Sequence, residues 1–225
     1  MKDINRKALL GMLRLLIMLA LAVFLPAWRL AYWQGWVCLL AFFVPAIAIS
    51  IYVAKKDPAL LERRLKTGAS SEKEPVQKII QTVTAIVFVL DFAASALDHR
   101  FGWSSVPAWE SVAGVLLIEV GFLIVFIVFK VNTYTSGIIE VAPGQTVIST
   151  GPYAMVRHPM YSGALLMLFG IPLALGSWWG ELANVVMTVA FAWRLLDEER
   201  FLASNLLGYG EYRDKVKYRL VPLVW

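Results

Sequence analysis

Four apolar stretches constrain the fold more than any other feature of the chain. They cover residues 8–28, 36–54, 79–97 and 109–129, and a membrane-spanning helix needs roughly 20 mostly apolar residues. A fifth apolar stretch, 160–196, is too long for one ordinary span and is interrupted by Pro172 and Gly176-Ser177. Because proline and glycine break helices, we expect a helical hairpin here. Its tip is predicted at 177–180, and each arm, at fewer than about 20 residues, is short for a full span.

The composition agrees with a membrane protein. The chain is 59% hydrophobic and 16% charged, whereas average soluble domains are roughly 45–50% apolar and about 25% charged. This excludes an ordinary soluble domain, a disordered chain and a nucleic-acid binder of the usual kind. The single cysteine, Cys38, cannot form an internal disulfide and is expected to be buried or to face lipid.

The basic residues predict the topology. Of the 21 Lys and Arg residues, all except Arg29 and Arg100 lie before or within the first apolar stretch, between the second and third, after the fourth, or from residue 194 onward. The positive-inside rule then places both termini in the cytoplasm. The first apolar stretch has no small-residue cleavage site after it, so we expect a retained helix and not a cleaved signal peptide. The net charge of +5 fits loops that face anionic lipid.

These features predict an all-α, polytopic transmembrane helix bundle with four spanning helices and a C-terminal helical hairpin. We expect a single membrane domain over 1–225, in which 1–130 is the scaffold and 131–225 holds a loop, the hairpin and the tail. Residues 55–78 are interpreted as a solvated loop at the lipid headgroups, with a short amphipathic helix at 58–65. Residues 145–149 have a strand-like pattern.

Searches for common site motifs exclude several chemistries. The sequence has no G-x-G-x-x-G after a strand, no P-loop and no H-E-x-x-H. The two histidines, His99 and His158, are predicted on opposite membrane faces, so we expect no metal site. Asp91 is an acid inside a predicted span, with Glu119 a second candidate. Such an acid is a functional candidate by default, or it hydrogen-bonds a neighbouring helix.

Residues 149–163 combine glycine, proline, arginine, histidine and two tyrosines directly before an apolar helix. Pro159 suits the first turn of that helix. The backbone amides around His158 would then point out of a helix N-terminus, which favours a carboxylate or phosphate, and Arg157 could add a bidentate contact. The simpler interpretation is a loop at the membrane boundary.

A second polar cluster, Arg194 to Arg200, closes the hairpin at the same face. Arg194 and Glu198 are four residues apart on one helical side, and the simpler interpretation is a solvated helix end. Three successive acids, Asp197 to Glu199, would also suit a cationic ligand. An anion site and a cation site at the two ends of one hairpin together fit a zwitterion.

The sequence resembles the isoprenylcysteine carboxyl methyltransferase and phospholipid methyltransferase superfamily of integral membrane enzymes, in its bacterial branch. The matching residues are Gly151-Pro152-Tyr153, Arg157-His158-Pro159, Tyr161-Ser162-Gly163, Glu198-Glu199, Gly208, Tyr212 and 219–222, with weaker similarity at 57–64 and 98–103. The resemblance implies S-adenosyl-L-methionine as methyl donor in a cytoplasmic-side pocket. It further implies a multi-pass protein of the bacterial inner membrane.

The resemblance also implies roles for individual residues. Glu198 and Glu199 would hold the polar ends of the cofactor, and Tyr212 would close the site. Arg194 would meet a substrate carboxylate, and Glu198 or His158 could accept a proton from an amine, which makes these three the catalytic candidates. The residues expected to line the cofactor are Gly151, Tyr153, Arg157, His158, Pro159 and Tyr161.

The expected acceptor is a carboxylate or amine of an amphipathic, lipid-like molecule that enters sideways from the bilayer. Two other functions stay open at this point. One is an NADPH-dependent membrane reductase acting on a sterol- or polyprenyl-like substrate, because related membrane folds support that chemistry. The other is a non-enzymatic membrane protein that retains the fold. The oligomeric state is open as well.

Overall fold

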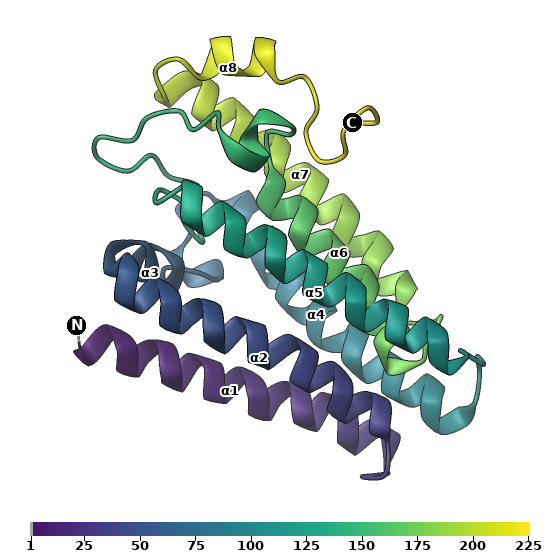
Figure 1. Ribbon diagram of the computed structural model, residues 1–225. Helices are drawn as coiled ribbons and strands as arrows, with labels where there is room; N and C mark the ends of the chain where they lie inside the picture. Colours follow the sequence, from purple (N-terminus) through teal and green to yellow (C-terminus); the bar gives the residue numbers. More distant parts are fainter. Residues whose placement is uncertain (1) are drawn as a thin grey trace.

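The computed structural model describes residues 2–225, which form eight α-helices and two short 3₁₀ helices with no strand among them (Figure 1). The all-helical prediction is therefore confirmed, and the strand predicted at 145–149 is wrong, because this segment is irregular. The elements are α1 (Lys2–Ala27), α2 (Trp33–Lys56), α3 (Pro58–Leu65), η1 (Ala69–Ser71), α4 (Pro75–Phe101), α5 (Ala108–Val131), η2 (Gly151–Ala154), α6 (Pro159–Leu175), α7 (Glu181–Asn205) and α8 (Tyr209–Lys215).

Helices α1, α2, α4 and α5 are long and apolar enough to cross a membrane, which confirms the four predicted spans. Each is longer than the apolar stretch that predicted it. Large apolar side chains on their outer surfaces are exposed, such as Leu9 and Leu25 on α1 and Leu116 on α5. In a bilayer these side chains face hydrocarbon, which is as apolar as they are. The chain is thus a multi-pass membrane protein.

The hairpin is present, but its arms are unequal. Helix α6 has 17 residues and ends at Gly176, whose φ of 73° is the left-handed conformation that glycine adopts without strain. Helix α7 has 25 residues and continues through Asn205, well beyond the arm predicted to end at residue 196. The extra turns carry Asp197, Glu198 and Glu199 out of the apolar part of the bundle.

Four glycines bring α5 and α6 into backbone contact. A Cβ atom added to Gly121 would lie 2.5 Å from the carbonyl oxygen of Gly163, and one added to Gly114 would lie 2.6 Å from that of Gly170. Glycines seven residues apart on each helix fall on one face, and small residues at such an interface let helices in membranes approach closely. We call these four residues the glycine seam. It places the end of α5 beside the start of α6, as Figure 1 shows.

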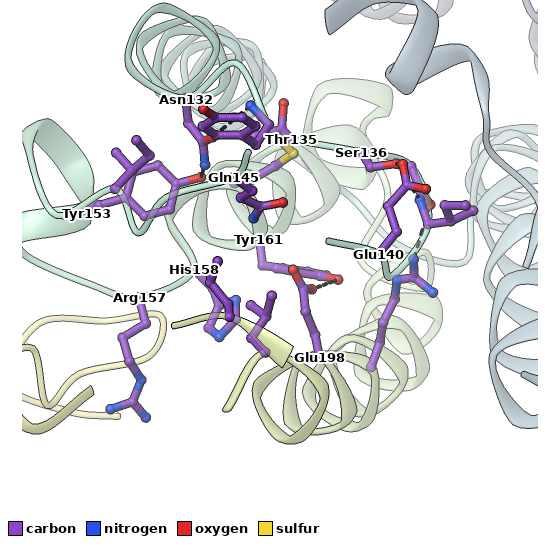
Figure 2. Close-up of a pocket in the computed structure, with 18 of the residues that line it drawn as sticks. Asn132, Thr135, Ser136, Glu140, Gln145, Tyr153, Arg157, His158, Tyr161 and Glu198 are labelled. Atoms are coloured by element: carbon purple, nitrogen blue, oxygen red, sulfur yellow. Dashed lines mark hydrogen bonds between the residues drawn. The ribbon is translucent and has the colours of Figure 1, made fainter. Parts of the chain in front are cut away.

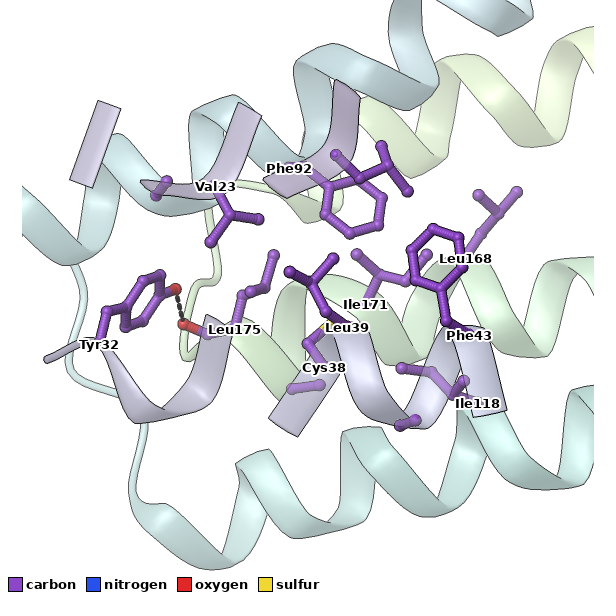
Figure 3. Packing of buried hydrophobic residues seen from close by; sticks show 14 of the residues in the cluster. Val23, Tyr32, Cys38, Leu39, Phe43, Phe92, Ile118, Leu168, Ile171 and Leu175 are labelled. Atoms are coloured by element: carbon purple, nitrogen blue, oxygen red, sulfur yellow. Dashed lines mark hydrogen bonds between the residues drawn. The ribbon is translucent and has the colours of Figure 1, made fainter. Parts of the chain in front are cut away.

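The buried apolar side chains of α1, α2, α4, α5, α6 and α7 meet in one core (Figure 3). Val23 of α1, Leu39 of α2, Phe92 of α4, Ile118 of α5 and Ile171 of α6 all contribute. Cys38 lies in the same cluster and is fully buried. This core holds α6, which is too short to span on its own, against the spanning helices.

The hairpin tip is fastened by polar contacts at one end of the bundle. Asp98 of α4 accepts hydrogen bonds from the Ser177 hydroxyl at 2.6 Å and from the Ser104 amide at 2.7 Å. His99 stacks on Tyr32 with ring centroids 3.9 Å apart. His99 therefore belongs to this end, far from the end where α3, α8 and the N-terminus gather (Figure 1). Asp91 is also fully buried, with no hydrogen-bond partner for its carboxylate within residues 2–225.

Candidate functional site

A polar cavity of about 300 Å³ lies at the end of the bundle that carries α3 and α8 (Figure 2). Its walls come from the loop after α5, the start of α6, the far end of α7, and α8. Segment 55–78 also contributes a wall, through Arg64 and Thr67. The prediction of a solvated loop for this segment is therefore wrong in part, because Leu60, Leu61 and Glu72 are buried, and the helix predicted at 58–65 is confirmed as α3.

Most of the predicted site residues meet at this cavity, although they are spread over 60 positions of the sequence. Those that line it are Tyr153, Arg157, His158, Tyr161, Arg194, Glu198 and Tyr212. The other three, Gly151, Pro159 and Glu199, lie beside these residues in the chain and do not line the cavity.

The three successive acids of α7 point in three directions, because residues of an α-helix are rotated by about 100° from one to the next. Asp197 accepts a hydrogen bond from Gln77 of α4 at 2.8 Å. Glu198 faces the cavity and accepts one from the Tyr161 hydroxyl at 2.9 Å. No Lys, Arg or His nitrogen of the described chain lies within 4 Å of the Glu198 carboxylate. Glu198 therefore has no ion-pair partner at the cavity wall.

Glu199 points the other way and binds three cationic or polar side chains. Its carboxylate lies 2.6 Å from Nε of Arg157, 3.2 Å from Nε2 of His158 and 3.1 Å from Nε of Arg219. Burial alone would raise the pKa of Glu199, but the hydrogen bonds from His158 and Arg157 outweigh it and lower the pKa to about 2. Glu199 thus joins the start of α6 to the tail that follows α8.

Arg157 completes this junction. Its guanidinium donates to the carbonyl oxygens of Val216 at 3.0 Å and Lys217 at 3.2 Å, and Figure 2 shows it pointing away from the middle of the cavity. The backbone amides of Arg157 and His158 donate to Tyr218 and Arg219 at 2.9 Å each. We expected the His158 amide to be open to a ligand, and in the structure the tail occupies it.

This junction predicts how the tail responds to acid. Because the pKa of Glu199 is lowered in the folded protein, the stability that the carboxylate contributes is full above about pH 4.5 and is lost as the pH falls toward about 2. Pepsin should therefore cleave residues 216–225 progressively faster over that window. In a Glu199→Gln variant the cleavage rate should vary with pH only as the activity of pepsin does. If the variant and the wild type had the same pH profile of cleavage, Glu199 would not be the group that holds the tail.

Arg194 is bound by partners outside α7. Its guanidinium lies 2.7 Å from Glu72 and donates to Gln77 at 2.8 Å and to the Gly137 carbonyl at 3.1 Å. It forms no ion pair with Glu198, although the spacing of four residues allowed one. Arg194 therefore ties the loop after α5 to α4 and to the segment before it. Sequence reasoning missed Glu72, because it lies in the segment predicted to be solvated.

Arg64 of α3 is a cavity residue that sequence reasoning did not select. Its Nη1 donates to the Ser136 carbonyl at 2.6 Å, and its guanidinium lies 5.5 Å from the ring centroid of Phe129. Among the described residues, no carboxylate oxygen lies within 4 Å of it. Burial lowers the pKa of Arg64, and the nearby Tyr161 and Glu198 oppose this. The spacing of Leu60, Leu61 and Arg64 on one helical face was the available signal.

The remaining cavity wall is rich in neutral polar groups. Asn132 donates to the Tyr153 hydroxyl at 2.8 Å, and the Tyr212 hydroxyl donates to the Tyr153 carbonyl at 2.8 Å. Burial raises the pKa of Tyr153 to about 12 and also raises that of Tyr212, so both phenols stay protonated at neutral pH. Glu140 is a second acid on this wall and accepts from the Ser136 hydroxyl at 2.9 Å.

Comparisons with known proteins agree on one family. The sequence model described as phospholipid methyltransferase matches residues 109–208. The chain is also 30% identical over 165 residues to the cobalt-zinc-cadmium resistance protein CzcN of Cupriavidus metallidurans, covering 71% of this chain and 68% of that protein. The chain belongs to the phospholipid methyltransferase family. In this methyltransferase family member, the matched residues include α5, α6, most of the cavity wall and the acids of α7. Arg64 and Tyr212 lie outside them.

Proposed function

We propose that this membrane protein is an S-adenosyl-L-methionine-dependent methyltransferase, which methylates a carboxylate or amine of an amphipathic, lipid-like molecule. The observation that carries the proposal is the Glu198 carboxylate, which faces a polar cavity without a cationic partner in the described chain. A carboxylate that faces a cavity without an ion-pair partner suits a cationic ligand, because it can accept charge-assisted hydrogen bonds from that ligand. Membership of a methyltransferase family supports the same reaction.

The residues of the cavity fit this cofactor. S-adenosyl-L-methionine carries a sulfonium, an ammonium, a carboxylate and an adenine ring. Glu198 and Glu140 offer two carboxylates for its positive groups. The start of α6 opens into the cavity at Met160 and Tyr161, and a helix N-terminus attracts a carboxylate. The hydroxyls and rings of Tyr153 and Tyr212 would complete the site around the remaining polar atoms and the adenine.

The chemistry asks the protein mainly to position two reactants and to exclude water. The cofactor, when bound, supplies a methyl group that its sulfonium already activates. Glu198 would hold the positive end of the cofactor, and the tail fastened by Glu199 and Arg157 would cover the site. An acceptor carboxylate needs no general base. An acceptor amine would lose a proton to Glu198 or His158. Arg194 would position the loop after α5 through Gly137.

We further propose that the cavity and both termini lie on the cytoplasmic side of the bacterial inner membrane. The N-terminus, α3 and α8 gather at the cavity end of the bundle (Figure 1). The same end holds most of the Lys and Arg residues, and the positive-inside rule assigns such an end to the cytoplasm. A cofactor that enters from the cytoplasm would then reach the cavity from water.

Calorimetric titration of S-adenosylhomocysteine into detergent-solubilised protein tests the proposed function. We expect binding to the wild type and a loss of about tenfold or more in affinity for Glu198→Gln, since hydrogen bonds to charged groups contribute about 1.5–3 kcal/mol. Glu211→Gln, which removes an exposed acid of α8, is the matched control and should bind like the wild type. Absence of binding to folded wild-type protein would reject the proposal, and titration with NADPH would then test the reductase function.

A further inference from the structure

A second cavity, with a largely apolar wall, lies beside the polar one. It has a volume of about 260 Å³ between α1, α2, α3 and the end of α5. Gly11, Leu15, Ile49, Val53 and Phe129 are among its lining residues. Three of the four helices that form it are membrane spans, so its apolar wall continues a surface that faces hydrocarbon. We call it the apolar groove.

Arg64 is the residue that the two cavities share, because it lines both the polar cavity and the apolar groove. It lacks a carboxylate partner within 4 Å in the chain as described, whereas Arg157, Arg194 and Arg219 at the same site each have one. A guanidinium with free donors at such a boundary suits an anionic group, which it binds through charge-assisted and often bidentate hydrogen bonds.

We infer that Arg64 binds the anionic headgroup of the methyl acceptor, while the single hydrocarbon chain of that acceptor lies in the apolar groove between α1, α2, α3 and α5. This inference rests on the proposed function and adds to it the charge of the acceptor, its orientation and its entry site. Arg64 selects an anionic amphiphile from the bilayer and holds its polar end at the cavity that contains Glu198. The groove's small volume and apolar wall fit one chain, with its apolar end toward the lipid.

The chemistry of the polar cavity supports this division of roles. The acids Glu198 and Glu140 and the start of α6 serve the charges of the cofactor, as argued above. That leaves Arg64 as a cation whose position, next to Phe129 and the spanning helices, matches a molecule from the membrane. A carboxylate headgroup would bind Arg64 in its ionised form. An ionised carboxylate accepts a methyl group without a general base.

Binding of three amphiphiles with the same chain tests the inference without any methyl transfer. Oleate, oleyl alcohol and oleylamine are titrated into the protein in lipid nanodiscs. We expect oleate to bind more tightly than oleyl alcohol. Arg64→Gln should lower the affinity for oleate by about tenfold or more, the size expected for losing a charge-assisted hydrogen bond. Arg64→Lys should restore part of the preference. Arg63→Gln removes a neighbouring charge outside both cavities and should leave the preference for oleate over oleyl alcohol intact.

The chain offers a second variant that blocks the groove without disturbing the fold. A Cβ atom at Gly11 would meet nothing within 4 Å, and leucine favours a helix more than glycine does. Gly11→Leu should therefore fill the groove and weaken oleate and oleyl alcohol alike, whereas Gly11→Ala should have a small effect. If oleate and oleyl alcohol bound to Gly11→Leu as tightly as to the wild type, the assignment of the groove would be overturned.

The cofactor titration separates this inference from the proposed function. Unchanged S-adenosylhomocysteine affinity in Arg64→Gln, together with lost oleate preference, would support the inference. A loss of S-adenosylhomocysteine binding in that variant would overturn it, because Arg64 would then belong to the cofactor. If the wild type prefers oleate through Arg64 but binds no S-adenosylhomocysteine, the anionic amphiphile site stands and the methyltransferase proposal fails.

Discussion

Replacing Gly121 with leucine should prevent the native bundle from assembling. The new side chain would start 2.5 Å from the Gly163 carbonyl oxygen and 2.5 Å from the Met167 side chain. Overpacking a core typically costs about 1–3 kcal/mol, and here backbone must move, so we expect about 3 kcal/mol or more. Thermal unfolding in detergent, followed by circular dichroism and by size-exclusion chromatography, measures the loss.

Gly11→Leu is the matched control for this substitution. It makes the same chemical change in a spanning helix, but its Cβ meets nothing within 4 Å. It should unfold at a temperature equal to or above that of the wild type. If Gly121→Leu were as stable as Gly11→Leu, the close contact of α5 and α6 would not be a determinant of the fold.

Replacing Glu199 with alanine is expected to detach the tail and to abolish cofactor binding. The change leaves Arg157 buried without its carboxylate and removes the partner of Arg219. Breaking a buried ion pair by removing one member costs about 3–5 kcal/mol. The loss should be visible as rapid proteolysis of residues 216–225 at neutral pH, together with a lower unfolding temperature.

Asp197→Asn provides the comparison on the same turn of α7. Its ion pair with Arg200 is exposed on the arginine side, at 77%, and exposed pairs contribute about 0–1 kcal/mol. We therefore expect the tail of Asp197→Asn to remain protected. Equal proteolysis of the two variants would mean that the negative charge of this turn, and not the position of Glu199, holds the tail.

The elements of the fold that local chemistry determines could be predicted from the sequence. Segment lengths and hydropathy identified the four spans. Asp57 and Pro58 are a favourable N-cap and first residue, and α3 begins there, with Asp57 accepting a hydrogen bond from the Leu60 amide at 2.9 Å. The break in the fifth apolar stretch was visible in Gly176, which ends α6 in the left-handed conformation.

Features that depend on how the helices pack could not be predicted in this way. Glu198 and Glu199 are identical in type and adjacent, yet one faces the cavity and the other is enclosed by Arg157, His158 and Arg219. The rotation of α7 about its axis decides this, and no local pattern reports it. The contact of Arg194 with Glu72 joins residues 122 positions apart, so nothing near Arg194 in the sequence indicates it.

The strand predicted at 145–149 was wrong for a related reason. The β-branched residues Thr146, Val147 and Ile148 favour a strand only where a second strand can satisfy the backbone hydrogen bonds. The described residues contain no strand with which this segment could pair. Gln145 instead accepts a hydrogen bond from the Ala142 amide at 2.8 Å, which holds the segment as part of the cavity wall.

The glycine seam also determines where one wall of the polar cavity begins and ends. Segment 132–158 leaves α5 at Val131 and returns at Pro159, and Gly151 lies beside Val131. The seam therefore anchors both stems of this segment at one point of the bundle. Contacts from outside the segment hold it as well, since Arg194 donates to the Gly137 carbonyl and Glu199 binds Arg157. A substitution deep in the contact of α5 with α6 should therefore alter the shape of a cavity wall that lies several helical turns away.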